Sequence, residues 1–325
     1  MESENLKDLS VVIPSFNEEE NIKLIYPKLK STLEGLKKSY EIIFVDDGST
    51  DKTYDFLRKI CQDDKNVEAV VFRRNFGQTA AISAGFDYAE GDVIITLDAD
   101  LQNDPEDIPF LLKKIDDGFD VVSGWRMNRK DPLITKRLPS YISNWLISSF
   151  TGVKLHDYGC TLKAYKKEVA KNIKLYGEMH RFIPALAKWV GASICEVKVK
   201  HFPRKYGKSK YGFSRIGRGF LDLLTVKFLL IFSTRPIQIF GRFGLISIFL
   251  GFFSGIVLII MKIVHKVDMT GNPFLYLSIL FFLVGAQFIS MGLLGEIISR
   301  TYHESQNKPV YFVKEVLTHK KKVKQ

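Results

Sequence analysis

Two aspartates separated by one residue are the clearest chemical signal in the chain. Asp98 and Asp100 lie in the segment Val93–Pro105 (VIITLDADLQNDP), which holds the only Asp-x-Asp of the sequence. On extended backbone, residues i and i+2 point the same way, so both carboxylates can meet at one point after a strand. Carboxylate oxygens are suitable ligands for Mg²⁺ and Mn²⁺. These ions take their remaining ligands from water and substrate phosphates. The spacing predicts a site for Mg²⁺ or Mn²⁺, although aspartate is also common where strands simply end.

Polar residues also follow two earlier strand patterns, in Val11–Ile22 (VVIPSFNEEENI) and Phe44–Thr53 (FVDDGSTDKT). Gly48 allows the backbone to approach a ligand closely, and Asp46 and Asp47 can accept hydrogen bonds from a base or a ribose. Taken alone, this segment could equally be a helix-capping turn. The sequence contains neither a P-loop nor a dinucleotide-binding glycine motif.

Short β-rich runs that alternate with helical patterns must position these residues. Such alternation with near-continuous apolar strands predicts an α/β fold, a mostly parallel sheet with helices on both faces and ligands at the carboxyl ends of the strands. Asn17 with Glu20 predicts a capping box, and Asp104 with Pro105 a second helix start. The predicted strands are Leu9–Pro14, Tyr40–Val45, Val67–Phe72, Val93–Leu97 and Asp120–Ser123.

The alternation loosens after residue 125. A helix is predicted over Met179–Val190 and a strand over Ile194–Lys200. A dense run of lysines and arginines between Lys198 and Arg218 leads into the apolar segment Phe220–Phe232, which indicates a helix lying on a membrane surface.

Two uncharged runs, Phe243–Met261 and Pro273–Gly295, are long enough to cross a bilayer, which takes about 20 residues of helix. Two buried helices of a soluble core are the alternative. The basic flanks predict a hairpin with both termini in the cytoplasm, so the expected location is the inner (plasma) membrane, as a multi-pass protein. The polar first residues indicate no signal peptide. The expected organisation is a catalytic domain (1–212), an interfacial amphipathic helix (213–235), a two-span hairpin (236–299) and a basic cytoplasmic tail (300–325).

The net charge of +11 fits a protein that rests on anionic lipid or handles anionic substrates, and no motif supports nucleic-acid binding. Three widely spaced cysteines agree with a reducing compartment. Small residues in the two apolar runs favour helix packing and a homo-oligomer.

The three motifs VVIPSFNEEENI, FVDDGSTDKT and LDADLQNDPE, in this order, resemble family 2 glycosyltransferases with the GT-A nucleotide-sugar-binding fold. RKYGKSKYG (Arg204–Gly212) is similar to an element of the polyisoprenyl-phosphate glycosyltransferases, the dolichol-phosphate mannose synthase-like enzymes and their bacterial undecaprenyl-phosphate relatives. The resemblance covers residues from about 9 to 215, and the two apolar runs match bacterial members that carry a membrane domain.

The resemblance implies roles for matching positions. Pro14, Phe16, Glu18, Asp46, Asp47 and Asp98 would bind the donor nucleotide, and Asp98, Asp100 and Gln102 the metal and diphosphate. Asp157 takes the place of a proposed catalytic base and, with Asp100 and Arg204, is a candidate catalytic residue. The acceptor phosphate would contact Arg126, Arg137, Ser140, Ser209 and Lys210. Trp125 departs from the pattern of the relatives beside Arg126.

The implied reaction is inverting transfer of a sugar, with glucose from UDP-glucose as the first choice, to a polyprenyl phosphate such as undecaprenyl phosphate. The lipid-linked product would serve cell-envelope glycosylation. Other donors (GDP-mannose, UDP-N-acetylglucosamine or a UDP-amino sugar) are the alternative. A processive polysaccharide synthase shares the fold, but the chain lacks its Gln-x-x-Arg-Trp element. A non-catalytic module that binds anionic lipid is the alternative from another class.

Overall fold

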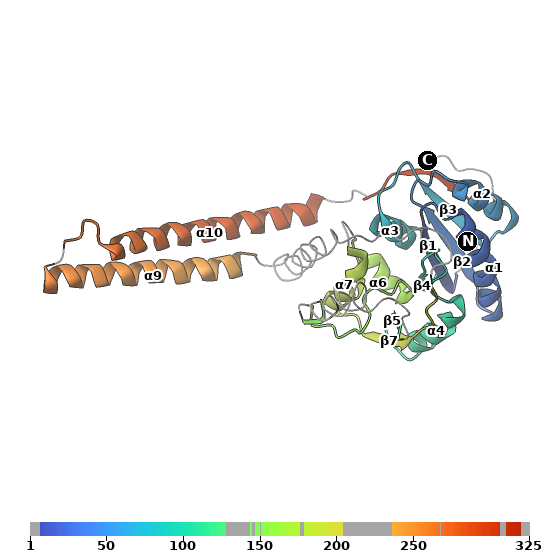
Figure 1. Ribbon diagram of the computed structural model, residues 1–325, viewed down its shortest axis with the longest axis horizontal. Helices are drawn as coiled ribbons and strands as arrows, with labels where there is room; N and C mark the ends of the chain where they lie inside the picture. Colours follow the sequence, from blue (N-terminus) through green and yellow to red (C-terminus); the bar gives the residue numbers. More distant parts are fainter. Residues whose placement is uncertain are drawn as a thin grey trace, which may run out of the picture. The chain divides into compact units, whose positions relative to one another are not determined.

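The computed structural model describes residues 7–127, 144, 147–149, 151–175, 179–203, 236–266, 268–305 and 310–319. The chain forms two compact units. The first unit combines Met1–Leu223 with the C-terminal residues Pro309–Gln325 and contains the sheet; the second is Leu224–Lys308 and contains two long helices (Figure 1).

The sheet of the first unit has eight strands in the order β7-β5-β6-β4-β1-β2-β3-β8. Neighbours run parallel in the pairs β1–β2, β1–β4, β2–β3 and β5–β7, and antiparallel in the pairs β3–β8, β4–β6 and β5–β6. The strands are β1 (Leu9–Ser15), β2 (Tyr40–Asp46), β3 (Val67–Phe72), β4 (Val93–Thr96), β5 (Val121–Trp125), β6 (Lys163–Lys166), β7 (Ile194–Lys198) and β8 (Val313–Leu317).

The predicted α/β fold is confirmed, as a mixed sheet whose β1, β2, β3 and β4 are parallel. Every residue of β2 is buried, as expected for a central strand covered on both faces. The sequence did not predict β6 or β8. Both are antiparallel to their neighbours, and β8 comes from the segment predicted as a basic cytoplasmic tail (300–325).

Helices cover the two faces of the sheet. One face packs against helices whose apolar residues share a core with Val11, Ile13 and Phe44; they are α1 (Glu19–Gly35), α2 (Thr53–Asp63) and α4 (Ile108–Asp116), the last preceded by the short helix η1 (Pro105–Asp107). On the other face, α3 lies so close to β1 that a Cβ atom at Gly85 would be 2.0 Å from Val12. The helices of this face are α3 (Gln78–Tyr88), α6 (Lys167–Asn172) and α7 (Ile183–Trp189), the last preceded by the short helix η3 (Met179–Phe182) (Figure 1).

One of the two predicted helix starts is confirmed. Asp104 caps η1, because its carboxylate accepts a hydrogen bond from the backbone N–H of Glu106 and Pro105 follows it. The predicted capping box at Asn17 is wrong: Asn17 has a φ of 57° and its side chain accepts the N–H of Thr50, in the loop after β2. A partner distant in sequence has replaced the local one.

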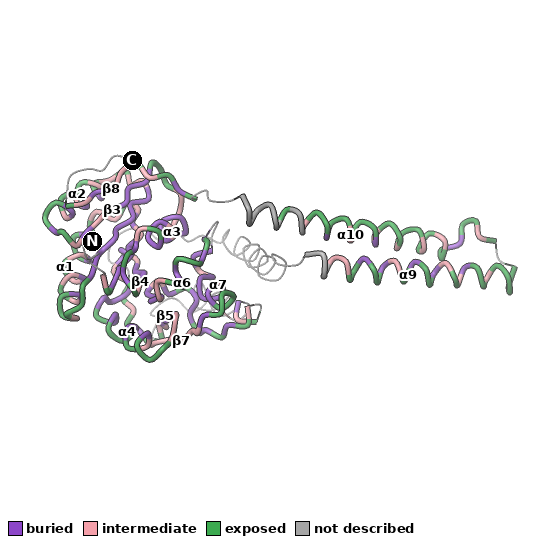
Figure 2. The backbone as a smooth tube through the Cα atoms, turned by 180° about the vertical axis from the view of Figure 1, so that it is seen from behind, coloured by how far each residue is buried: buried purple, intermediate pink, exposed green. Residues whose placement is uncertain are grey.

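The second unit is a hairpin of α9 (Pro236–His265) and α10 (Pro273–Ser305). Within them, Phe240–His265 and Pro273–Gly295 are long and apolar enough to cross a membrane. The two helices approach closely at glycines, since a Cβ atom at Gly244 would be 2.9 Å from the carbonyl oxygen of Gly285. Many residues along both helices are exposed (Figure 2), and large apolar residues are among them, which suits a lipid environment.

Candidate active site

The carboxyl ends of β1, β2 and β4 meet at one edge of the sheet, because these strands are parallel neighbours. Asp46 is the last residue of β2 and lies opposite Ser15, the last residue of β1. Asp98 and Asp100 follow the end of β4. The structure therefore brings the two predicted aspartate motifs to the same edge, where ligands of such sheets bind.

Asp47 holds the loop between β3 and α3. Its two carboxylate oxygens accept hydrogen bonds from the backbone N–H groups of Phe76, at 2.6 Å, and Gly77, at 2.9 Å. The neighbouring Gly48 has a φ of 71°, and a Cβ atom there would be 2.5 Å from the carbonyl carbon of Arg74. The residue after Asp47 must be glycine for both reasons, the positive φ and the close approach of the loop.

Asp46 is buried, and its carboxylate accepts the backbone N–H of Ser49 at 3.0 Å. Burial raises the pKa of this carboxyl, and the hydrogen bond to Ser49 opposes that shift. Asp46 thus shapes the turn that carries Asp47 and Gly48.

The loop after β1 is bound to the loop after β2. The N–H of Asn17 donates to the Ser49 hydroxyl and the N–H of Glu18 to the Thr53 hydroxyl, both at 2.9 Å. Pro14 lies within β1, and Phe16 directly follows it. The predicted donor-binding residues of β1 and β2 therefore lie at two strand ends and in the two loops after them, which hydrogen bonds connect.

Asp98 and Asp100 lie at the centre of this edge. The side-chain amide of Gln78 donates to the Asp98 carboxylate at 2.9 Å, and the N–H of Gln102 donates to Asp100 at 3.1 Å. Burial, and next the charge of Asp100, raise the pKa of Asp98 to about 7. Leu101, between Asp100 and Gln102, has a φ of 61°, an uncommon conformation for a large side chain.

These residues fit a divalent cation. Two neighbouring carboxylates whose charges repel each other would be stabilised by a cation, and Mg²⁺ commonly binds one or two carboxylates together with substrate phosphates. Among the described residues there is no cluster of three or more His, Cys, Asp or Glu side chains able to enclose a metal. A cation at Asp98 and Asp100 would therefore take the rest of its ligands from amide groups, water or substrate.

Arg126 and Asp157 form an ion pair at the end of β5. The Arg126 Nε and Nη2 atoms donate to the two oxygens of Asp157 at 2.7 and 2.9 Å, and the backbone N–H of Gly159 also donates to this carboxylate, at 3.1 Å. Both side chains are largely buried. Burial opposes the charge of Arg126, but the pair with Asp157 more than offsets this and raises the arginine pKa.

Lys163 is a buried cation that the sequence did not single out. Its ammonium group donates to the carbonyl oxygens of Tyr158, at 3.3 Å, and Cys160, and so closes the loop that carries Asp157. Burial lowers its pKa, while the charges of Asp157 and Asp98 act in the opposite direction. The lysine therefore places a buried amino group close enough to Asp157 and Asp98 to interact with their charges.

Five predicted site residues lie outside the described part of the chain: Arg137, Ser140, Arg204, Ser209 and Lys210. The described chain does reach Pro203. Directly before it, the N–H of Phe202 donates to the carbonyl oxygen of Gln102 at 2.9 Å, and the N–H of Lys200 donates to Asp107 at 2.6 Å. The segment that leads to Arg204 is thus bound beside Gln102.

The loop between β3 and α3 was not predicted as part of the site. It supplies the N–H groups of Phe76 and Gly77 to Asp47, and it leads directly to Gln78, which binds Asp98. Gly77, with a φ of 97°, was a usable signal, because a glycine between a strand and a helix often allows a turn.

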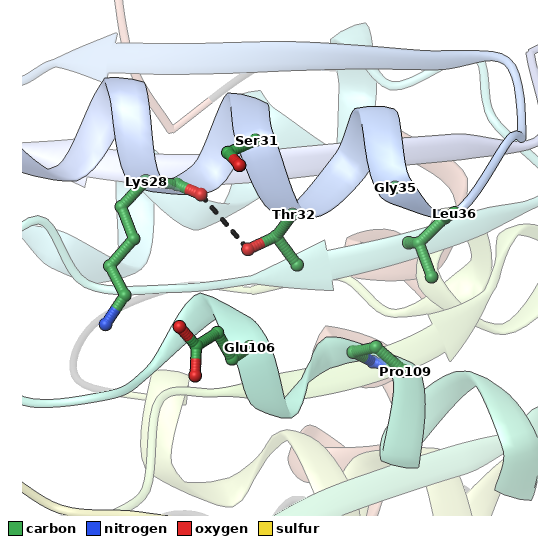
Figure 3. Close-up of a pocket in the computed structure, with 7 residues that line it drawn as sticks. All are labelled: Lys28, Ser31, Thr32, Gly35, Leu36, Glu106 and Pro109. Atoms are coloured by element: carbon green, nitrogen blue, oxygen red, sulfur yellow. Dashed lines mark hydrogen bonds between the residues drawn. The ribbon is translucent and has the colours of Figure 1, made fainter.

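A surface groove of about 490 Å³ lies elsewhere. Figure 3 shows that Lys28, Ser31 and Thr32 of α1 form one wall, with Glu106 and Pro109 opposite. The groove follows the helices on one face of the sheet, not the strand ends. It lacks the converging carboxylates of the sheet edge, so the candidate active site is not in this groove.

A sheet with a parallel centre, acidic turns at adjacent strand ends and an Asp-x-Asp motif defines a nucleotide-sugar-binding fold of the GT-A type. The family model for glycosyl transferase family 2 matches residues 10–174, and the chain belongs to this family. It is a glycosyltransferase, as the sequence motifs predicted.

Curated relatives agree with this assignment. The chain is 42% identical over 316 residues to a dodecaprenyl-phosphate galacturonate synthase of Rhizobium johnstonii, covering 95% of this chain and 93% of the relative. It is 40% identical over 314 residues to an undecaprenyl-phosphate 4-deoxy-4-formamido-L-arabinose transferase of Salmonella choleraesuis, covering 96% and 94%. The predicted kinship with polyprenyl-phosphate sugar transferases is confirmed.

Solved structures support the fold. A glucosyl-3-phosphoglycerate synthase from Mycobacterium tuberculosis, in complex with Mn²⁺ and UDP-glucose, has a TM-score of 0.54 at 17% identity, covering 68% of this chain and 79% of that one. At this identity the match concerns the fold alone.

Proposed function

We propose that the enzyme transfers a sugar, with inversion, from a nucleotide sugar to a polyprenyl phosphate at the membrane surface. The observation that carries the proposal is the sheet edge where the Asp46–Asp47 turn and the Asp98–Asp100 pair meet, in a chain 42% identical to a dodecaprenyl-phosphate galacturonate synthase. The turn suits a nucleoside and the carboxylate pair a metal-bound diphosphate. The product would be a lipid-linked monophosphate sugar for the cell envelope.

The donor end of the reaction needs charge compensation. Breaking a sugar–diphosphate bond builds negative charge on the leaving nucleotide. Asp98 and Asp100, with Gln102, would hold Mg²⁺ or Mn²⁺, which supplies Lewis-acid stabilisation of that charge when bound. A structural neighbour binds Mn²⁺ with UDP-glucose, which supports a divalent ion here. Arg204 would add positive charge to that of the cation at the leaving diphosphate.

At the acceptor end, Arg126 would bind the polyprenyl phosphate together with Arg137, Ser140, Ser209 and Lys210. A phosphate is already ionised near neutral pH and needs little help from a base. The Asp157 carboxylate accepts N–H groups from Arg126 and from Gly159, so these bonds occupy both of its oxygens. We assign Asp157 the role of fixing the arginine rather than of removing a proton.

The membrane placement follows from the acceptor. A long isoprenoid leaves a bilayer only at a cost of ~0.8 kcal/mol per CH₂, so the active site must come to the lipid surface. The hairpin of α9 and α10 would span the inner membrane, with the catalytic domain and both termini in the cytoplasm and the basic residues after 198 against anionic lipid. Glycine contacts within the hairpin show that its helices can pack closely, and a homo-oligomer through the exposed faces is part of the proposal.

The sugar is the finer part of the proposal. UDP-glucose with undecaprenyl phosphate remains our first choice, with GDP-mannose, UDP-N-acetylglucosamine and UDP-amino sugars as alternatives. The relatives are named for galacturonate and formamido-arabinose transfer, so both sugars belong among the donors to be compared.

The test is transfer by the purified full chain in detergent. Undecaprenyl phosphate and Mg²⁺ are incubated with each radiolabelled nucleotide sugar in turn, and label is counted in the organic phase. We expect one donor to give lipid-linked label that disappears with EDTA. Failure of every donor to label the lipid, or labelling that excess EDTA leaves unchanged, would contradict the proposal.

A further inference from the structure

The C-terminal strand β8 completes the sheet beside the donor loops. It follows the hairpin, after the end of α10 at Ser305, and pairs antiparallel with β3, with Val70 opposite Val316 and Phe72 opposite Val313. Without β8, β3 would be an edge strand with unpaired backbone groups. The residues just before β8 make the contacts that matter for the site.

Tyr311 is the best anchored of these residues. It is only 7% exposed, and its ring stacks on Phe72, the last residue of β3, at 5.1 Å between centroids and 14° between planes. Its hydroxyl donates to the carboxylate of Asp87, on α3, at 2.8 Å. Next to it, the carbonyl oxygen of Phe312 accepts the N–H of Arg73 at 3.1 Å. Tyr311 therefore joins the end of β3 to α3.

These contacts bracket the loop 73–77. Its Phe76 and Gly77 give both N–H groups to Asp47, and Gln78, the first residue of α3, gives its amide to Asp98. The loop also touches Gly48 through the backbone of Arg74. A shift of β3 relative to α3 would move the partners of Asp47 and Asp98 together.

We propose that Tyr311 is a positioning residue of the donor site, acting through the loop 73–77, so that the residues after the membrane hairpin complete the nucleotide pocket. The inference rests on the proposed function, since it concerns the donor of that reaction. Tyr311 need not touch the nucleotide: its stacking on Phe72 and its bond to Asp87 set the spacing of the two elements between which the loop is held.

The test compares three variants of the full chain in detergent. Tyr311→Phe removes the bond to Asp87 and keeps the stacked ring, while Tyr311→Ala removes both. Tyr26→Phe is the matched control, because it removes a tyrosine–aspartate bond of the same 2.8 Å length, to Asp64, away from the loop. Titration with UDP and Mn²⁺ measures binding, and donor KM and kcat are measured with the acceptor saturating.

We expect UDP to bind about threefold more weakly to Tyr311→Phe and about tenfold more weakly to Tyr311→Ala. The donor KM should rise by similar factors while kcat changes little, and Tyr26→Phe should match the wild type. Unchanged UDP affinity in Tyr311→Ala, or an equal loss in Tyr26→Phe, would overturn the inference.

Hydrogen exchange separates this inference from the proposed function. Without nucleotide, the amides of Phe76 and Gly77 should exchange faster in Tyr311→Ala than in the wild type, and at wild-type rate in Tyr26→Phe. A wild type that binds no UDP would count against the proposed donor, while the exchange result would still decide the role of Tyr311. Equal exchange in all variants would refute that role.

Discussion

One buried aspartate, Asp100, follows β4 and another, Asp157, lies beside the end of β5, but their charges are neutralised differently. After β4, burial and the charge of Asp100 raise the pKa of Asp98 to about 7, so the pair resists carrying two negative charges. Beside the end of β5, Asp157, from the loop before β6, is matched by the guanidinium of Arg126 in a two-pronged ion pair. An aspartate side chain alone therefore does not define a role. Asp98 and Asp100 suit a cation that arrives with the substrate, whereas Asp157 binds Arg126 of the same chain.

The largest expected effect is on catalysis at the β4 end. Asp100→Asn keeps the shape of the side chain but removes a metal-binding charge, and transfer should fall about a thousandfold. Membrane insertion and the unfolding midpoint should stay near wild type. The assay is lipid-linked label formed per minute, with Asp116→Asn, an exposed aspartate at the end of α4, as the matched control. Near-normal transfer by Asp100→Asn would show that Asp100 does not hold a catalytic metal.

The next effect is on stability at the β5 end. Asp157→Asn leaves the largely buried Arg126 charge without its partner, and the free energy of unfolding should drop by about 3 kcal/mol. Denaturant unfolding of the purified chain measures this drop. Equal destabilisation by Asp157→Asn and Asp100→Asn would show that the ion pair with Arg126 does not give Asp157 a special role in stability.

The pH dependence of stability should separate the ends further. The pKa of Asp98 is about 7 in the folded chain against 3.8 as its ordinary value. Between these values the unfolded chain loses the proton and the folded chain keeps it, so stability falls as pH rises. In EDTA, the Tm of Asp98→Asn minus that of the wild type should therefore grow from pH 4 to pH 7. A difference that stays flat over this range would show that Asp98 is not perturbed.

The two sites also differ in how far they could be predicted from the sequence. Asp98 and Asp100 are two residues apart, so strand geometry alone places them together. Arg126 and Asp157 are far apart in the chain, and their contact depends on β6 pairing with both β4 and β5. The lysine-rich β6 (KAYK) gives no apolar pattern, although Lys163 is buried in it. Predicting the pair would have required the order of the strands.

The fold shows a similar division. Five apolar runs were correctly predicted as strands because burial on both faces selects continuous β-branched residues. The strand β8 was overlooked, although Val313 and Val316 lie in a β-rich segment, because the basic tail around it indicated solvent. The cap at Asn17 failed for a related reason: its partner, Thr50, is brought near only by the pairing of β1 with β2.

The smallest expected effect concerns the geometry of the ion pair. Arg126→Lys keeps a positive charge beside Asp157 but replaces two parallel N–H donors from Nε and Nη2 with one ammonium group. Unfolding free energy should fall by about 1 kcal/mol, clearly less than in Asp157→Asn, because the carboxylate keeps a cation. Since the guanidinium is also the proposed acceptor ligand, the acceptor KM should rise while the donor KM stays constant. Steady-state kinetics with either substrate varied will show this split, and a rise confined to the donor KM would assign Arg126 to the β4 side of the site instead.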